Sequence, residues 1–242
     1  MEGWRLHSRS SPRAGGTPFV LIHGLIISSL YMIPLAECLA KTAEVHALDL
    51  PGFGRSEGSA RAPSVPASAE ALAQWLDAAG IKRCHLVANS LGCQICVDFA
   101  ARFPRRVATL TLIGPTIDPA AHAIPRQALR LAAELLHEPV RLWLNHLIDF
   151  LRAGPRRVWT MIREMFADRI ASKLPRVAAR TLVLRGERDP IAPESWAMEA
   201  ARLLPDGRHL TLPRAGHCVH YSHPAETARA ILAFIEAAED GR

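Results

Sequence analysis

The stretch that decides the fold is HLVANSLGCQI, residues 85–95. It starts as an apolar run typical of a buried strand and continues after Ser90 as a run of small and apolar residues that favours a helix. A sharp strand-to-helix turn that presents a reactive serine is normally written G-x-S-x-G. Here Ala88 occupies the position of the first glycine, whereas Gly92 keeps the second. Alone, the stretch fits either such a turn or an ordinary helix start in which Ser90 is the N-cap.

The rest of the chain repeats this alternation of short apolar runs and helical patterns. Strands are predicted within residues 17–24, 43–56, 84–89, 107–115, 180–190 and 207–213, and helices within residues 66–80, 91–104 and 224–239. Short apolar strands that alternate with helices indicate an α/β fold, in which a mostly parallel twisted sheet is covered by helices on both faces.

Residues 116–175 break the pattern, because they read as helical throughout and show no strand signal. We therefore predict an α/β core formed by residues 1–115 and 176–242, and a helical insertion, residues 116–175, that forms a lid. Residues 116–176 contain ten Lys and Arg residues and six Asp and Glu residues. This difference accounts for +4 of the net charge of +6. Solvated helix faces explain most charge of this kind, and an anionic substrate or surface is the alternative.

Composition excludes several classes of protein. The 242 residues fit one α/β domain with an insertion, and no run of eighteen apolar residues occurs, so we expect no membrane span. The first residues lack the apolar region of a secretory signal, which predicts a cytoplasmic protein. Despite the basic balance, no nucleic-acid-reading motif is found. Cys93 and Cys96 form a C-x-x-C without a second pair, which favours buried thiols over a zinc site.

In parallel α/β sheets, functional residues collect at the carboxyl ends of the strands. Three predicted strands are followed at that end by residues that carry acyl-transfer chemistry, namely Ser90, Asp189 and His217. A serine hydroxyl is a poor nucleophile unless a base lies within hydrogen-bonding reach, and a histidine oriented by a carboxylate is such a base. The order Ser, Asp, His along the chain therefore predicts a catalytic triad.

This order resembles the α/β-hydrolase superfamily. The matching motifs are HG at 23–24, DLPGFGRS at 49–56, ANSLG at 88–92, GERDPIAP at 186–193 and AGHCVHYSHP at 215–224, and they span nearly the whole chain. The resemblance implies that Ser90 is the nucleophile, His217 the base and Asp189 its partner. It also implies that the backbone N–H groups of Leu25 and Leu91 form the oxyanion hole.

Each role has a competing residue nearby. Glu187 lies two residues before Asp189, and Asp118 follows the fourth predicted strand, from which some family members take their acid. His220 and His223 lie close to His217, but His217 directly follows a glycine after the last strand, as the family pattern requires.

A serine nucleophile favours acyl chemistry, so we predict hydrolysis of a carboxylic ester, a thioester or a lactone with an apolar acyl group. The elbow residue Asn89 and the arginine-rich insertion also resemble C–C bond hydrolases of vinylogous diketo acids, whereas Cys218 stands where that group carries tryptophan. A non-catalytic ligand-binding protein of this fold is the third alternative. We expect a small-molecule substrate, no nucleic acid, no metal and no cofactor, and oligomeric state is not predicted. Candidate pocket residues are His23, which we expect to brace the oxyanion loop, Asn89, Trp143 and Trp159.

Overall fold

The computed structural model describes residues 4–11, 15–58, 61–135 and 138–239. Within these residues one sheet has the strand order β1-β3-β2-β4-β5-β6-β7. Its strands are β1 (Ser8–Ser11), β2 (Phe19–Ile22), β3 (Val45–Leu48), β4 (Cys84–Asn89), β5 (Val107–Ile113), β6 (Thr181–Gly186) and β7 (Gly207–Leu212). β1 pairs antiparallel with β3, and the other neighbouring strands are parallel. The predicted α/β architecture is confirmed.

The six predicted strands are present, and β1 is an addition that the sequence did not indicate. The central strands are buried on both faces because helices cover both, and β2 shows the expected run of four apolar residues. β1 has the sequence SRSS and lies at the edge of the sheet, partly exposed. Its pairing with β3 depends on backbone hydrogen bonds, so the sequence has no apolar pattern from which β1 could be predicted.

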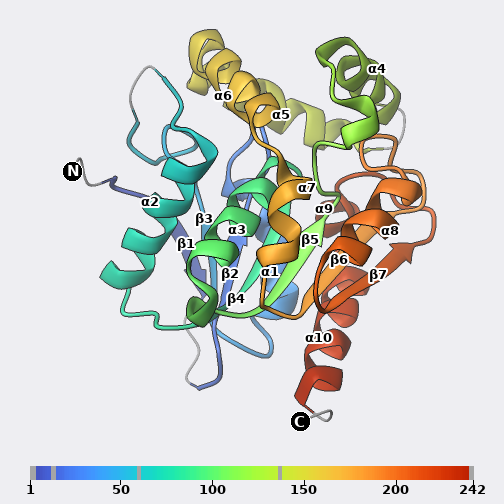
Figure 1. Ribbon diagram of the computed structural model, residues 1–242. Helices are drawn as coiled ribbons and strands as arrows, with labels where there is room; N and C mark the ends of the chain where they lie inside the picture. The colour runs from blue at the N-terminus through green and yellow to red at the C-terminus, as the bar shows by residue number, and fades with distance from the viewer. Residues whose placement is uncertain (1–3, 12–14, 59–60, 136–137, 240–242) are drawn as a thin grey trace.

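Side chains that alternate along the strands enter two hydrophobic cores, one on each face. Val20 and Ile22 of β2 belong to one core, and Phe19 and Leu21 belong to the other. The first core is covered by α2 (Val65–Ala78), α3 (Leu91–Arg102) and α8 (Glu194–Leu203), and the second by α1 (Ile33–Leu39), α9 (Val219–Ser222) and α10 (Pro224–Glu239) (Figure 1).

Between β5 and β6 the chain forms α4 (Ile124–Glu134), α5 (Val140–Ala153), α6 (Pro155–Ala167) and the short α7 (Ile170–Lys173). No strand occurs among the described residues of 116–175, which we call the helical segment. α4, α5 and α6 lie together above the sheet in Figure 1. Buried hydrogen bonds hold α5 and α6 there: Ser28 Oγ donates to Asp149 Oδ2 (2.7 Å) and Gln94 Nε2 donates to the carbonyl of Met165 (3.1 Å). No helix in the described part of the chain is long and apolar enough to cross a bilayer.

Candidate active site

The turn between β4 and α3 places Ser90 in a strained conformation, with φ 55° and ψ −120°. A non-glycine residue in this region carries a conformational cost and is held there by its surroundings. The turn is tight: a Cβ on Gly92 would lie 2.7 Å from the carbonyl oxygens of Ile22 and His23, so only glycine fits. Ala88 is fully buried within the last part of β4, and the core accommodates its methyl group. The residues around Ser90 thus form a sharp elbow although the first glycine is missing.

Asp189 and His217 meet beyond the ends of β6 and β7. Asp189 Oδ2 lies 2.8 Å from Nδ1 of His217, and Oδ1 accepts hydrogen bonds from the amides of Ile191 (2.8 Å) and Ala192 (2.9 Å). Because a carboxylate only accepts, His217 must carry its proton on Nδ1 when the imidazole is neutral. Nε2 is buried and has no hydrogen-bond partner among the described residues. It is therefore available to accept a proton.

The competing residues have other partners. Glu187 lies at the surface, where Oε2 accepts from the amide of Arg214 (2.8 Å). Asp118 is buried but forms an ion pair with Arg130 (2.8 Å) and accepts from the amide of Ala120. Neither carboxylate has a hydrogen bond to the imidazole of His217.

The two other histidines of the last loop also lie apart from the pair. His220 is fully buried and packs edge-on against Tyr31, with 4.4 Å between ring centroids. Burial, together with the nearby His217 and His146, lowers the pKa of His220 to about 3, so its ring is neutral. His223 Nδ1 lies 3.0 Å from the hydroxyl of Ser222. Among the three histidines at positions 217, 220 and 223, His217 is the one that combines a carboxylate partner with a ring nitrogen that has no hydrogen bond.

Two glutamates of the helical segment contact the loop that carries His217. The amide of His217 donates to Oε1 of Glu134 (2.5 Å), and the amide of Cys218 donates to Oε1 of Glu138 (2.7 Å). Both side chains are buried, and burial raises the pKa of Glu134 to about 8 and raises that of Glu138. Burial alone would lower the pKa of His217, but Asp189, Glu134 and Glu138 outweigh it and raise that pKa. The helical segment thus anchors this loop, and the ionised forms of its two glutamates raise the pKa of the imidazole.

A hydrogen-bonded chain connects the elbow with the loop after β2. The amide of Gly24 donates to the hydroxyl of Tyr31 (2.6 Å), and that hydroxyl donates to Oδ1 of Asn89 (2.7 Å). Nδ2 of Asn89 donates to the carbonyls of Ile113 (3.1 Å) and His217 (3.3 Å). Both polar atoms of the Asn89 side chain form hydrogen bonds. The side chain therefore links Tyr31, the end of β5 and the loop that carries His217.

The expected oxyanion donors belong to the residue after Ser90 and to the turn after β2. Leu91 is the first residue of α3, so its N–H has no carbonyl four residues earlier in the helix to bond. Leu25 lies in the turn after β2 and, with Ser90, lines the cavity described next. Two backbone N–H groups beside a serine are the arrangement that stabilises a developing oxyanion.

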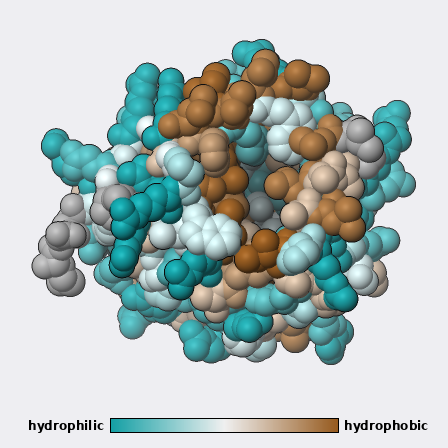
Figure 2. All heavy atoms as spheres, turned by 90° about the horizontal axis from the view of Figure 1, so that it is seen from above, coloured by the Kyte–Doolittle hydropathy of each residue, from teal (hydrophilic) through white to brown (hydrophobic). Residues whose placement is uncertain are grey.

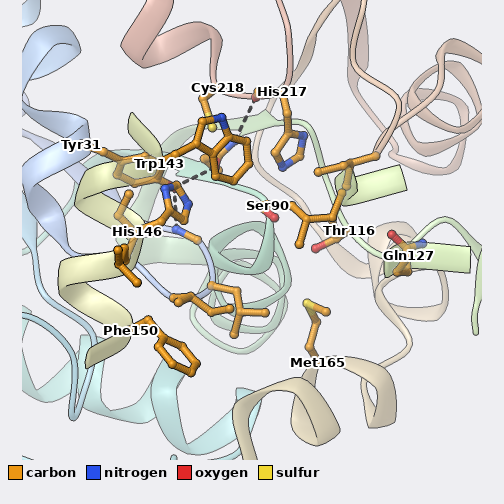
Figure 3. Close-up of a pocket in the computed structure, with 18 residues that line it drawn as sticks. Tyr31, Ser90, Thr116, Gln127, Trp143, His146, Phe150, Met165, His217 and Cys218 are labelled. Atoms are coloured by element: carbon orange, nitrogen blue, oxygen red, sulfur yellow. Dashed lines mark hydrogen bonds between the residues drawn. The ribbon is translucent and has the colours of Figure 1, made fainter. Parts of the chain in front are cut away.

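Ser90 and His217 open into a cavity of about 370 Å³ between the elbow and the helical segment (Figure 3). Its wall is mainly apolar and contains no Arg, Lys, Asp or Glu among the described residues. The remaining lining residues are Gly24, Leu25, Ile26, Ile27, Tyr31, Asn89, Thr116, Gln127, Leu131, Trp143, His146, Leu147, Phe150, Met165, Ile191 and Cys218. The buried Oγ1 of Thr116 and Nε1 of Trp143 have no hydrogen-bond partner among the described residues, so the cavity offers a few polar groups within an apolar surface.

Of the four expected pocket residues, Asn89 and Trp143 line this cavity, whereas His23 and Trp159 do not. His23 is fully buried behind the oxyanion loop, where Nδ1 donates to the carbonyl of Gly24 (2.8 Å) and Nε2 accepts from the amide of Leu50 (2.8 Å). Trp159 is 53% exposed, because α6 turns the neighbouring Val158 inward and Trp159 lies about 100° away around the helix. The expectation that His23 and Trp159 line the pocket is therefore wrong.

Three residues of the site were missed in the sequence: Tyr31, Glu134 and Glu138. Tyr31 stands in a stretch with no recognisable motif. The glutamates were counted only as charges. Glu134 ends α4 and Glu138 precedes α5, so no helical spacing indicates that they act together.

The chain belongs to the α/β-hydrolase family: the family model described as "alpha/beta hydrolase fold" matches residues 17–148. A second model, described as "TAP-like protein", matches residues 163–239. The chain is 30% identical over 243 residues to the dihydrolipoyllysine-residue acetyltransferase component of an acetoin cleaving system from Pseudomonas putida, covering 91% of this chain and 64% of that protein's length.

Other relatives share the fold across most of the chain. A 2-hydroxy-6-oxo-6-phenylhexa-2,4-dienoate hydrolase from Burkholderia cepacia is 24% identical over 214 residues, which cover 77% of this chain and 75% of that protein. A thermophilic esterase from Thermogutta terrifontis superposes with a TM-score of 0.79 at 21% identity, covering 96% of this chain and 93% of the esterase. The chain is thus a hydrolase of the α/β type that is similar in sequence to a dienoate hydrolase and shares its fold with an esterase.

Proposed function

We propose that the protein is a serine hydrolase that cleaves a carboxylic ester with an apolar acyl group through an acyl-enzyme intermediate. The observation that carries this proposal is the shared cavity: Ser90 and the free Nε2 side of His217 open into a mainly apolar space without charged walls. Thioesters and lactones react by the same steps and belong to the same proposal.

The reaction has two halves, the acylation and the deacylation of Ser90, and His217 accepts and returns a proton in each. His217 accepts the hydroxyl proton through Nε2 while Ser90 Oγ attacks the ester carbonyl, and Asp189 stabilises the imidazolium that forms. The N–H groups of Leu25 and Leu91 bind the oxyanion, and a lost donor of this kind typically costs roughly 10²–10³ in rate. His217 then protonates the leaving alcohol. Water, deprotonated by the same nitrogen, releases the carboxylic acid and restores Ser90.

The helical segment acts in this proposal as a lid that builds the acyl pocket. Leu131, Trp143, Leu147, Phe150 and Met165 all come from it and line the cavity. A cavity of about 370 Å³ lies toward the small end of the range found for small-molecule sites. We therefore expect the best soluble substrates to carry acyl chains of medium length.

C–C bond hydrolysis is the second candidate, favoured by the similarity to the dienoate hydrolase. Arginines of the helical segment could serve its anionic substrate only if they reached the cavity. Instead, Arg130 pairs with Asp118, Arg126 donates to the carbonyl of Ala120 (2.8 Å), and Arg157 donates to that of Gly52 (2.6 Å). With no arginine or lysine among the described lining residues, the ester reaction fits the cavity better.

The test is a substrate panel. Purified protein is offered p-nitrophenyl esters of rising acyl length, an acyl thioester, a lactone and a vinylogous diketo acid, with Ser90→Ala as the control for background hydrolysis. We expect kcat/KM to peak at a medium-length ester, and Ser90→Ala to lose turnover while keeping the wild-type Tm. Preferential cleavage of the diketo acid would replace the ester proposal by the C–C one. Saturable binding without turnover of any compound would overturn both.

A further inference from the structure

The helix α5 presents its apolar stripe to solvent instead of to the core. Val140, Leu144, Leu147, Ile148 and Leu151 recur on one face, and they are between 47% and 75% exposed. Spacings of three and four residues of this kind normally mark the face that packs against the protein. The opposite face of α5 bears the buried Asp149, which bonds Ser28. Thus α5 is docked through the side that buries Leu142 and Asp149, and its exposed apolar stripe lies uncovered on another side.

The neighbouring α4 continues the same surface. Ile124, Leu129 and Leu131 on α4, and Leu135 directly after it, are each at least 43% exposed. Including Trp159 of α6, ten of the twelve exposed large apolar side chains among the described residues lie between residues 124 and 159. Figure 2, viewed from above the helical segment, shows apolar atoms gathered around a hollow and hydrophilic atoms toward the periphery. We call the exposed apolar side chains of 124–151 the outer face.

The outer face is continuous with the cavity at Ser90. Leu131 of α4 and Leu147 of α5 are about half exposed and also line the cavity. An apolar molecule that rests on the outer face can therefore pass into the cavity without crossing a charged barrier.

The acidic and basic side chains of the helical segment differ in their exposure to solvent, and this difference indicates the charge of the partner. Its acids Asp118, Glu134, Glu138, Asp149 and Asp168 are buried, and Glu164 is half-buried. Its exposed basic residues are Arg126, Arg141, Arg152, Arg156, Arg163 and Arg169. Toward solvent the segment thus shows apolar side chains and guanidinium groups, and no exposed carboxylate among the described residues of 116–175. A second copy of this face would meet it with like charges, whereas an anionic surface with an apolar interior complements both features.

We propose that the outer face docks on the surface of an anionic phospholipid bilayer and that the cavity receives its ester from that lipid layer. α4 and α5 would lie in the plane of the headgroups, with the leucines inserted at the acyl boundary and the arginines among the phosphates. The identity of the substrate in this proposal rests on the proposed ester hydrolysis, but the docking itself does not.

Docking is measured by vesicle sedimentation with full-length Ser90→Ala protein, so that no turnover alters the lipid. Phosphatidylcholine vesicles with and without phosphatidylglycerol are compared at low and physiological salt. We expect binding that requires phosphatidylglycerol and weakens with salt. The double variant Leu144→Gln/Leu151→Gln should bind at least about tenfold more weakly. Arg141→Gln should lose about fivefold. None of these three side chains lines the cavity.

Matched controls make the same chemical changes elsewhere. Met198→Gln/Leu210→Gln removes two large apolar side chains that are exposed outside 124–159, and Arg105→Gln removes an exposed arginine before β5. These variants should bind vesicles as the parent does. Equal losses in the test and control variants, or no binding to phosphatidylglycerol vesicles, would overturn the docking proposal. So would a dimer in sedimentation velocity that Leu144→Gln/Leu151→Gln dissociates.

Hydrolysis of a soluble p-nitrophenyl ester separates this proposal from the previous one. In protein that retains Ser90, the Leu144→Gln/Leu151→Gln and Arg141→Gln variants should hydrolyse the soluble ester at the wild-type rate. They should lose rate only on an ester embedded in anionic vesicles. Vesicle binding without hydrolysis of either ester would refute the proposed function and leave the docking intact.

Discussion

Replacing Asp189 with asparagine should reverse the proton position on His217. Oδ1 of Asp189 accepts hydrogen bonds from the amides of Ile191 and Ala192, so the carbonyl oxygen of an asparagine must occupy that place. Its NH₂ group then points at Nδ1, which lies 2.8 Å from Oδ2 in the native protein. Two donors cannot face one another, and the imidazole must therefore carry its proton on Nε2. In that form it cannot accept the proton of Ser90.

The expected loss of kcat follows from the two effects of the substitution. A wrong tautomer together with the missing counter-charge lowers kcat by roughly 10⁴ in serine hydrolases of known mechanism. At 1.36 kcal/mol for each tenfold change, the barrier rises by about 5 kcal/mol. Losing the carboxylate should also lower the pKa of His217, because Asp189 is the main group that raises it.

The assay is hydrolysis of p-nitrophenyl butyrate, with Tm recorded for each variant. Glu187→Gln is the matched control, since it removes a carboxylate two residues away whose Oε2 accepts only from the amide of Arg214 (2.8 Å). We expect kcat to fall by roughly 10³–10⁴ for Asp189→Asn and to change less than about threefold for Glu187→Gln. Near-wild-type turnover in Asp189→Asn, or the larger loss in Glu187→Gln, would refute the assignment.

Three further outcomes follow from the packing of the site. Glu134→Gln keeps the acceptor for the amide of His217 but removes a carboxyl group whose ionised form raises the imidazole pKa, so the acid limb of kcat/KM should move to lower pH; an unchanged pH profile would contradict this. Gly92→Ala should lower the free energy of unfolding by roughly 1–3 kcal/mol and reduce kcat, because its Cβ would press on the carbonyl of His23, measurable by urea denaturation and ester hydrolysis. Ala88→Gly should instead cost about 0.5–1 kcal/mol and leave kcat within a fewfold range, since alanine already fits.

Much of the fold was predictable because parallel strands that are buried on both faces appear in the sequence as continuous apolar runs. The edge strand β1 escaped prediction, since its pairing depends on backbone groups and its SRSS sequence carries no pattern. The positions of Ser90, Asp189 and His217 could be expected for a similar reason: each follows a strand, and parallel strands end at one edge of the sheet.

The rest of the site depends on contacts between distant segments. Glu134 and the amide of His217 are 83 residues apart in sequence, and Tyr31 reaches Asn89 across 58 residues. The misplacement of Trp159 arose because apolar content identifies a helix but not its rotation about its own axis. On α6 the buried positions are Val158, Met161 and Met165, which leaves Trp159 outside. For His23, closeness to the oxyanion loop was apparent, but the direction of the ring, toward the amide of Leu50, was not.

The central claim is that Ser90 forms a covalent acyl intermediate. Rapid quenching of the protein with p-nitrophenyl butyrate, followed by peptide mass spectrometry, tests it most directly. The account predicts one butyryl group on the peptide that contains Ser90, formed during an initial burst of p-nitrophenol and absent from Ser90→Ala. Steady turnover without that adduct, or an adduct of equal amount in Ser90→Ala, would contradict it.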